Sequence, residues 1–104
     1  MERSIKPQNL KANFKEVTLI DVRRKTDLET DTTKLPGATW YDPEQVETWA
    51  AQLPKDKEVV LYCVRGGSVS NSVLDHLRGK QIKARFIEGG IVGWKEAGGE
   101  VVAK

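Results

Sequence analysis

Three short runs of apolar and β-branched residues stand out along the chain. They are Val17–Ile20, Val59–Tyr62 and Ala84–Ile87. In the first two runs, neighbouring positions are apolar with little alternation, which is typical of strands in a sheet that is covered on both faces. Runs of four residues are also too short to be helices. The pattern therefore predicts three strands of a buried sheet.

Helical patterns lie before, between and after these runs. In the clearest one, apolar residues recur every three or four positions, Asp42 is suited to cap the first turn, and Pro54 follows the last turn. Gly79 is expected to end the helix that begins at Ser68. The expected helices are Pro7–Phe14, Pro43–Leu53, Ser68–Arg78 and Ile91–Ala97. Alternating strands and helices predict an α/β fold with a mainly parallel sheet and right-handed crossovers.

The composition narrows the class of protein. The chain has 104 residues, of which 38% are hydrophobic, so we expect one domain over residues 1–104. The longest apolar run, Val59–Val64, has six residues, and the first residues contain no apolar signal region, so we expect a cytoplasmic protein that does not enter a membrane. One cysteine and one histidine leave no internal disulfide and no thiolate-rich metal site. We therefore expect neither a metal nor another cofactor.

Charge is more informative by segment than in total. The net charge of +2 is too small to indicate a nucleic-acid partner. Basic residues outnumber acidic ones seven to three in residues 1–25 and seven to four in residues 59–104, whereas residues 26–58 hold three basic and eight acidic residues. This is either ordinary surface variation or a cationic surrounding that attracts a small anion to the only cysteine.

That cysteine, Cys63, directly follows the central apolar run, and the sequence Val64-Arg65-Gly66-Gly67-Ser68 then leads into a predicted helix. Ligands of parallel sheets bind beyond the carboxyl ends of the strands. We expect both glycines to adopt conformations that only glycine visits cheaply, so that the loop N–H groups converge on an anion. The helix N-terminus and Arg65 would stabilise a reactive thiolate. The alternative is an inert, packed cysteine, but a packed cysteine needs neither the glycine pair nor the helix start.

Four segments together resemble single-domain rhodaneses, the thiosulfate sulfurtransferase family. Each is short, but they occur in the family's order over nearly the whole chain and include the cysteine at the expected place. The segments are Leu19–Arg23, Leu35–Ala38, Val59–Cys63 with the loop that contains Gly66, and Glu88–Trp94. The resemblance implies a mainly parallel sheet of about five strands flanked by helices.

The resemblance also implies a reaction. Cys63 would take a sulfur atom from thiosulfate or a similar anion, forming a persulfide, and pass it to cyanide, a small thiol or the thiol of a partner protein. The N–H groups of Val64, Arg65, Gly66, Gly67 and Ser68 would bind the donor and the persulfide. The alternative is a persulfide carrier or interaction module that acts on a partner protein with little turnover of small molecules. The presence of the cysteine argues against a merely inactive module.

Two positions depart from the family pattern. Lys34 replaces a histidine whose role in the family is structural, and Ser68 occupies the fifth position after the cysteine, where members active on thiosulfate often have Arg, Lys or Thr. The second departure leaves the donor open. Related phosphatases have an arginine six positions after the cysteine, where this chain has Val69, so the clamp for a phosphoryl transition state is missing.

Other candidate residues are assigned less directly. Asp21 could serve as a general base, but the resemblance favours a buried carboxylate bound to loop backbone or to an arginine. Arg23, Arg24 and Lys25 either border the site or are solvated, and the sequence does not separate these cases. His76 falls thirteen residues after the cysteine, so we expect it on the surface of a helix rather than in the site.

Overall fold

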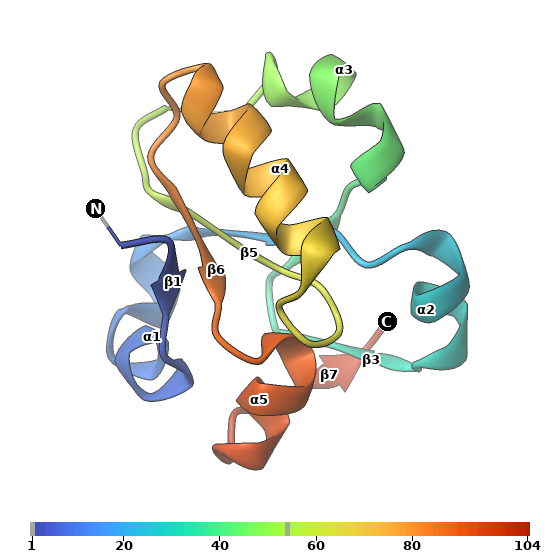
Figure 1. Cartoon of the computed structure of the whole chain (residues 1–104). Helices are drawn as coiled ribbons and strands as arrows, with labels where there is room; N and C mark the ends of the chain where they lie inside the picture. Colours follow the sequence, from blue (N-terminus) through green and yellow to red (C-terminus); the bar gives the residue numbers. More distant parts are fainter. Residues whose placement is uncertain (1, 54) are drawn as a thin grey trace.

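Five parallel strands form the central sheet, in the order β1-β6-β5-β2-β4 (Figure 1). The computed structural model describes residues 2–53 and 55–104. The strands are β1 (Ser4–Ile5), β2 (Thr18–Asp21), β4 (Thr39–Trp40), β5 (Val59–Tyr62) and β6 (Ala84–Ile87). The expected α/β fold with about five mainly parallel strands is confirmed.

The central strand β5 is fully buried, which explains its unbroken apolar sequence. Val59 and Leu61 face one core cluster and Val60 and Tyr62 face the other, because successive side chains of a strand point to opposite faces. Helices α3 and α4 supply the first cluster, and α1 and α5 supply the second. The helices are α1 (Pro7–Asn13), α2 (Lys25–Thr30), α3 (Val46–Ala50), α4 (Ser68–Gly79) and α5 (Gly90–Glu96), with the 3₁₀ turns η1 (Phe14–Glu16) and η2 (Pro43–Gln45). No helix in these two described ranges is long and apolar enough to cross a membrane.

The helix expected over residues 43–53 is divided in two. Asp42 caps it as expected, accepting a hydrogen bond from the Glu44 N–H at 2.9 Å, but the first turn is the 3₁₀ turn η2 and α3 then ends at Ala50. The expected stop at Pro54 lies outside the described residues.

Helix α4 ends at Gly79, one residue beyond the expected Arg78, and Gly79 belongs to the last helical turn instead of following it. The left-handed residue is Gln81, with φ 63°, and Ile82 donates its N–H to the Leu77 carbonyl at 3.0 Å. This is the hydrogen bond of a Schellman ending. It lets Ile82 turn into the core, where it is buried.

Two features give no signal in the sequence. Helix α2 has no buried residue, and the two-residue strands β3 (Thr33–Lys34) and β7 (Val102–Ala103) form a separate antiparallel pair. Such segments lack an apolar period, so their conformation depends on contacts with the rest of the chain. The last strand brings the C-terminus beside α2, where Lys104 donates its N–H to Thr32 at 2.9 Å.

Candidate active site

Cys63 lies at the carboxyl end of the central strand β5, between β2 and β6. It is buried, with 6% of its surface exposed, and begins the loop that leads to α4. In Figure 1 this yellow loop lies next to the start of α5. The structure thus places all the predicted site residues, Cys63, Val64, Arg65, Gly66, Gly67 and Ser68, in one turn between a rigid strand and the first residue of a twelve-residue helix.

The first turn of α5 binds the cysteine loop through backbone hydrogen bonds. Ile91 and Val92 donate their N–H groups to the carbonyls of Cys63 and Val64, at 3.0 and 3.1 Å. This approach requires Gly90: its φ is +62°, and a β-carbon built on it would lie 2.4 Å from the Val64 oxygen. Sequence reasoning missed this residue as part of the site. The available signal was a second glycine pair that begins two residues after the end of β6, at the same edge of the sheet as Cys63.

The two glycines of the loop have different roles. Gly66 has φ +73°, and its β-carbon would lie 3.2 Å from both the Gly89 nitrogen and the Ile87 oxygen. Gly67 has φ −90°, and a β-carbon there would meet no atom within 4 Å. The expected φ in a region that favours glycine is therefore confirmed at Gly66 and is wrong at Gly67, whose φ is negative.

The loop also presents free hydrogen-bond donors. Among the described residues, no acceptor takes a hydrogen bond from the N–H groups of residues 64–67. The first N–H groups of α4 follow directly, and helix starts leave such donors unpaired. Unpaired N–H groups in a glycine-containing loop before a helix favour the binding of an anion.

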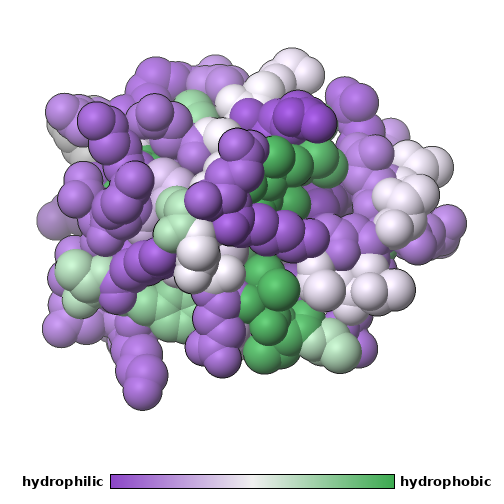
Figure 2. All heavy atoms as spheres, turned by 90° about the horizontal axis from the view of Figure 1, so that it is seen from below, coloured by the Kyte–Doolittle hydropathy of each residue, from purple (hydrophilic) through white to green (hydrophobic). Residues whose placement is uncertain are grey.

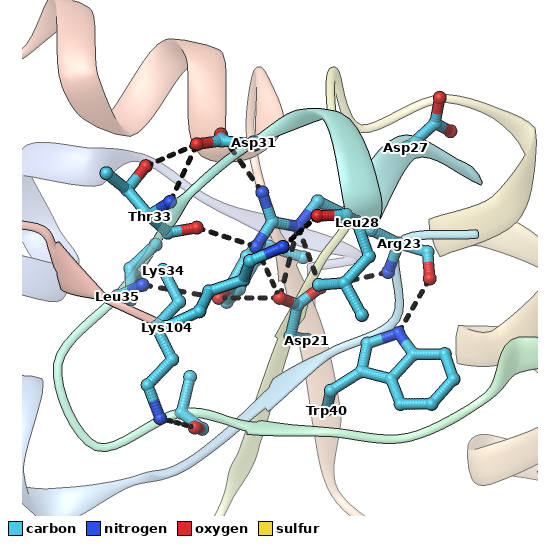
Figure 3. A network of polar contacts seen from close by, with 12 residues as sticks. Asp21, Arg23, Asp27, Leu28, Asp31, Thr33, Lys34, Leu35, Trp40 and Lys104 are labelled. Carbon is cyan, nitrogen blue, oxygen red and sulfur yellow. Dashed lines mark hydrogen bonds and ion pairs between the residues drawn. The ribbon is translucent and has the colours of Figure 1, made fainter. Parts of the chain in front are cut away.

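Asp21 is a buried structural carboxylate, as the resemblance implied (Figure 3). Its oxygens accept hydrogen bonds from the Arg23 N–H at 3.0 Å, the Arg23 guanidinium at 2.7 Å, and the Tyr62 hydroxyl at 3.1 Å. Burial, followed by the nearby negative charge of Asp21, raises the pKa of Tyr62 above its ordinary value. The carboxylate thus ties the end of β2 to the end of β5, directly before Cys63.

Arg23 neither borders the site nor lies in solvent, so both alternatives for this residue are wrong. Its side chain is completely buried and also binds Asp31 at 3.1 Å and the Thr33 carbonyl at 2.9 Å. Asp31 in turn pairs with Lys95 of α5 at 3.1 Å (Figure 3 shows the Arg23 end of this chain of charges). The network therefore connects β2, the segment before β3 and the helix that supports the cysteine loop.

The pKa values of this network reflect its charge pairing. Burial by itself would lower the pKa of Arg23, but hydrogen bonds and charge from Asp21 outweigh it and raise that pKa. Burial by itself would raise the pKa of Asp31, but hydrogen bonds from Thr33 and the bond and charge of Lys95 hold it well below the ordinary value. Both groups are therefore charged at neutral pH.

The remaining candidate residues lie outside the cysteine loop. Arg24 is exposed and borders a hollow that begins at Ser68. His76 is exposed on α4, as expected. Lys34 donates to the Ala38 carbonyl at 2.8 Å and so closes the turn before β4, which is a structural role. In residues 2–53 and 55–104, no three His, Cys, Asp or Glu side chains are grouped to hold a metal ion.

A comparison with family models decides the relationship: the Rhodanese-like domain model matches residues 6–97. The chain belongs to the rhodanese-like family. Two solved structures with this fold cover nearly all of it. A rhodanese-related protein from Thermoplasma volcanium has a TM-score of 0.88 at 26% identity, covering 99% of this chain and 100% of that one. A rhodanese-like domain protein from Staphylococcus aureus has a TM-score of 0.80 at 26% identity, covering 99% of each chain.

Part of this rhodanese domain is also similar to a segment of a longer curated protein. A tRNA sulfurtransferase of Desulfurococcus amylolyticus is 38% identical over 77 residues, which is 74% of this chain and 14% of that protein. The present rhodanese domain thus spans a small part of that relative's length.

Proposed function

We propose that this rhodanese domain is a sulfurtransferase that works through a persulfide on Cys63. The observation that supports this most directly is the position of the cysteine at the start of a loop whose N–H groups lack partners within the described chain and lead into the N-terminus of α4. This surrounding favours a thiolate and an anionic substrate together. The sulfurtransferase relative supports the same reaction class.

The reaction has two half-reactions. The Cys63 thiolate attacks the outer sulfur of thiosulfate or a similar anion, the sulfur–sulfur bond of the donor breaks, and sulfite leaves with the bonding electron pair. The protein then holds a Cys63 persulfide, whose outer sulfur lies near the N–H groups of residues 64–68. A thiophilic acceptor, cyanide or a thiol, attacks that outer sulfur, and Cys63 leaves as a thiolate ready for another cycle.

A second candidate is a persulfide carrier that serves a partner protein and turns over small molecules slowly. Two observations favour it. The curated relative contains the matching segment as a small part of a longer chain, and Ser68 stands where members active on thiosulfate often have a cation or threonine.

Mass spectrometry of the intact chain after thiosulfate treatment tests both candidates. We expect a gain of one sulfur atom that is absent in Cys63→Ser, with matching circular dichroism spectra for the two proteins. Steady turnover to cyanide then indicates the enzyme, whereas a stable persulfide without turnover indicates the carrier. A chain that gains no sulfur from thiosulfate, or gains it equally in Cys63→Ser, would overturn the persulfide mechanism.

A further inference from the structure

A groove leads away from the cysteine loop along α4. A hollow of about 470 Å³ is bordered by Arg24 and Lys25 after β2, by Glu44 of η2, and by Ser68 and Ser72 of α4. A second hollow of about 320 Å³ shares Glu44 and Ser72 with it and continues to His76. We call the two together the α4 groove. Hollows of this size hold ligands much larger than thiosulfate, so the groove has room for a substrate beyond the smallest donor.

The groove opens close to Cys63. The register of the sheet pairs Asp21 with Tyr62, so the next residues, Val22 and Cys63, leave the sheet on adjacent strands about 5 Å apart. Arg24 lies two residues further on, at most about 7 Å along the chain. The Cα atoms of Arg24 and Cys63 are therefore within about 12 Å of each other, and Ser68 of the cysteine loop borders the same hollow as Arg24.

Arg24 also lacks a partner, unlike most arginines of this protein. Among the described residues, Arg3, Arg23, Arg78 and Arg85 bind acceptors in the chain, whereas the guanidinium groups of Arg24 and of Arg65 in the cysteine loop bind none. Lys25 has no ion-pair partner in the described chain either. A guanidinium presents a planar pair of donors that matches a carboxylate. In the first hollow these two cations, without partners among the described residues, lie with one acid, Glu44, whereas the second hollow adds Glu47. The end of the groove next to Ser68 is therefore its positive end.

We propose that the α4 groove selects thiols that have carboxylates as acceptors of the Cys63 sulfur, with Arg24 and Lys25 binding the carboxylate. This rests on the proposed persulfide chemistry. The acceptor's thiolate forms a bond to the outer sulfur of the Cys63 persulfide, the bond between that sulfur and Cys63 Sγ breaks, and Cys63 leaves as a thiolate. The outer sulfur becomes the terminal sulfur of the acceptor's persulfide, and the total charge and the number of protons are unchanged, so no oxidant or reductant is consumed.

Three thiols used as acceptors, with thiosulfate as donor, test this assignment. Glutathione has two carboxylates, 2-mercaptoethanol is neutral, and cysteamine has an ammonium group and no carboxylate. For the double variant Arg24→Glu, Lys25→Glu we expect kcat/KM for glutathione to fall about tenfold or more, that for 2-mercaptoethanol to stay within about twofold, and that for cysteamine to rise. Because the reaction alternates between two half-reactions, kcat/KM for the acceptor does not contain the donor step, so weaker thiosulfate binding does not imitate the effect.

A matched control removes the effect of overall charge. Lys80 and Lys83 are exposed between α4 and β6, at the opposite edge of the sheet, where the Lys83 carbonyl binds the N–H of Val59 at the start of β5. Lys80→Glu, Lys83→Glu changes the net charge equally and should leave the order of the three thiols unchanged. Glu44→Gln should raise kcat/KM for glutathione by about two- to threefold, because it removes the negative charge that borders the same hollow as Arg24 and Lys25.

The outcomes separate this inference from the function on which it rests. An equal loss for glutathione in both double variants, or the same loss for all three thiols in the Arg24, Lys25 variant, would overturn the assignment while leaving sulfur transfer intact. If the unaltered protein forms the Cys63 persulfide but passes sulfur to none of the three thiols, the proposal that the groove selects the acceptor is also overturned. If Cys63 takes up no sulfur, it is the persulfide chemistry that fails.

Discussion

Gly90 packs directly against the carbonyl oxygen of Cys63: a β-carbon built on the glycine would lie 2.5 Å from that oxygen. No side chain fits into such a contact without moving the backbone of one segment or the other. The first turn of α5 and the cysteine loop therefore behave as one unit, although 27 positions separate the two residues. The position of the sulfur depends on a helix that contributes no reactive group.

Gly90→Ala should damage both activity and stability. The new methyl group would collide with two loop carbonyls, and φ +62° is itself unfavourable for alanine. We expect turnover to fall at least about tenfold and the free energy of unfolding to fall by about 2–4 kcal/mol. Sulfur transfer and urea unfolding of the same preparation measure both. Gly79→Ala, at a helical glycine with open space around it, is the control and should be neutral or slightly stabilising. Normal turnover in Gly90→Ala would show that the loop position is not set by α5.

Gly66→Ala and Gly67→Ala should behave differently although the residues are neighbours. At Gly66 the backbone is left-handed and the methyl group would press on the nitrogen of Gly89, so we expect the loop to shift and sulfur transfer to fall at least about fivefold, for a stability loss of about 1 kcal/mol. At Gly67 the space is open and φ is negative, so activity should stay within about twofold. Parallel assays of turnover and melting temperature measure the contrast. Equal activities in the two variants would mean that the loop conformation does not control the reaction.

The Asp31 carboxylate should make the free energy of unfolding depend on pH. Its pKa is lower in the folded protein than in the unfolded chain, so the unfolded state binds more protons below the ordinary carboxyl value, about 4. The stabilisation by ionised Asp31 is therefore fully present above about pH 4 and is lost as the pH falls below that value. Asp31→Asn should lower the free energy of unfolding by about 1 kcal/mol at pH 7, and the difference from the unaltered protein should shrink below about pH 4.

Urea unfolding at a series of pH values measures this difference. Asp27→Asn is the matched control, because Asp27 is exposed on the neighbouring helix α2 and its carboxylate has no ion-pair partner among the described residues. A constant difference between Asp31→Asn and the unaltered protein from pH 7 to pH 3 would contradict the charge pairing with Arg23 and Lys95.

Local patterns were sufficient to predict the central elements. The apolar run Val59–Tyr62 predicted β5 to the residue, and the periodic residues after Ser68 predicted α4. The loop between them and the special conformation of Gly66 followed from the same short stretch. These features depend on neighbours along the chain, such as burial of both strand faces and the start of a helix, so the amino-acid order contains them directly.

The sequence by itself thus determined the α/β class and the place of Cys63 between a buried strand and a helix. Only the tertiary structure decided which distant residues meet there. Gly90 reaches the cysteine carbonyl, Arg23 is buried against Asp31, and Arg24 faces the α4 groove because parallel strands far apart in sequence end at one edge of the sheet. The neighbours Arg23 and Arg24 have no local sequence pattern that tells which of them is buried and which is exposed. The packing around each side chain decides it, and that packing comes from residues distant in the sequence.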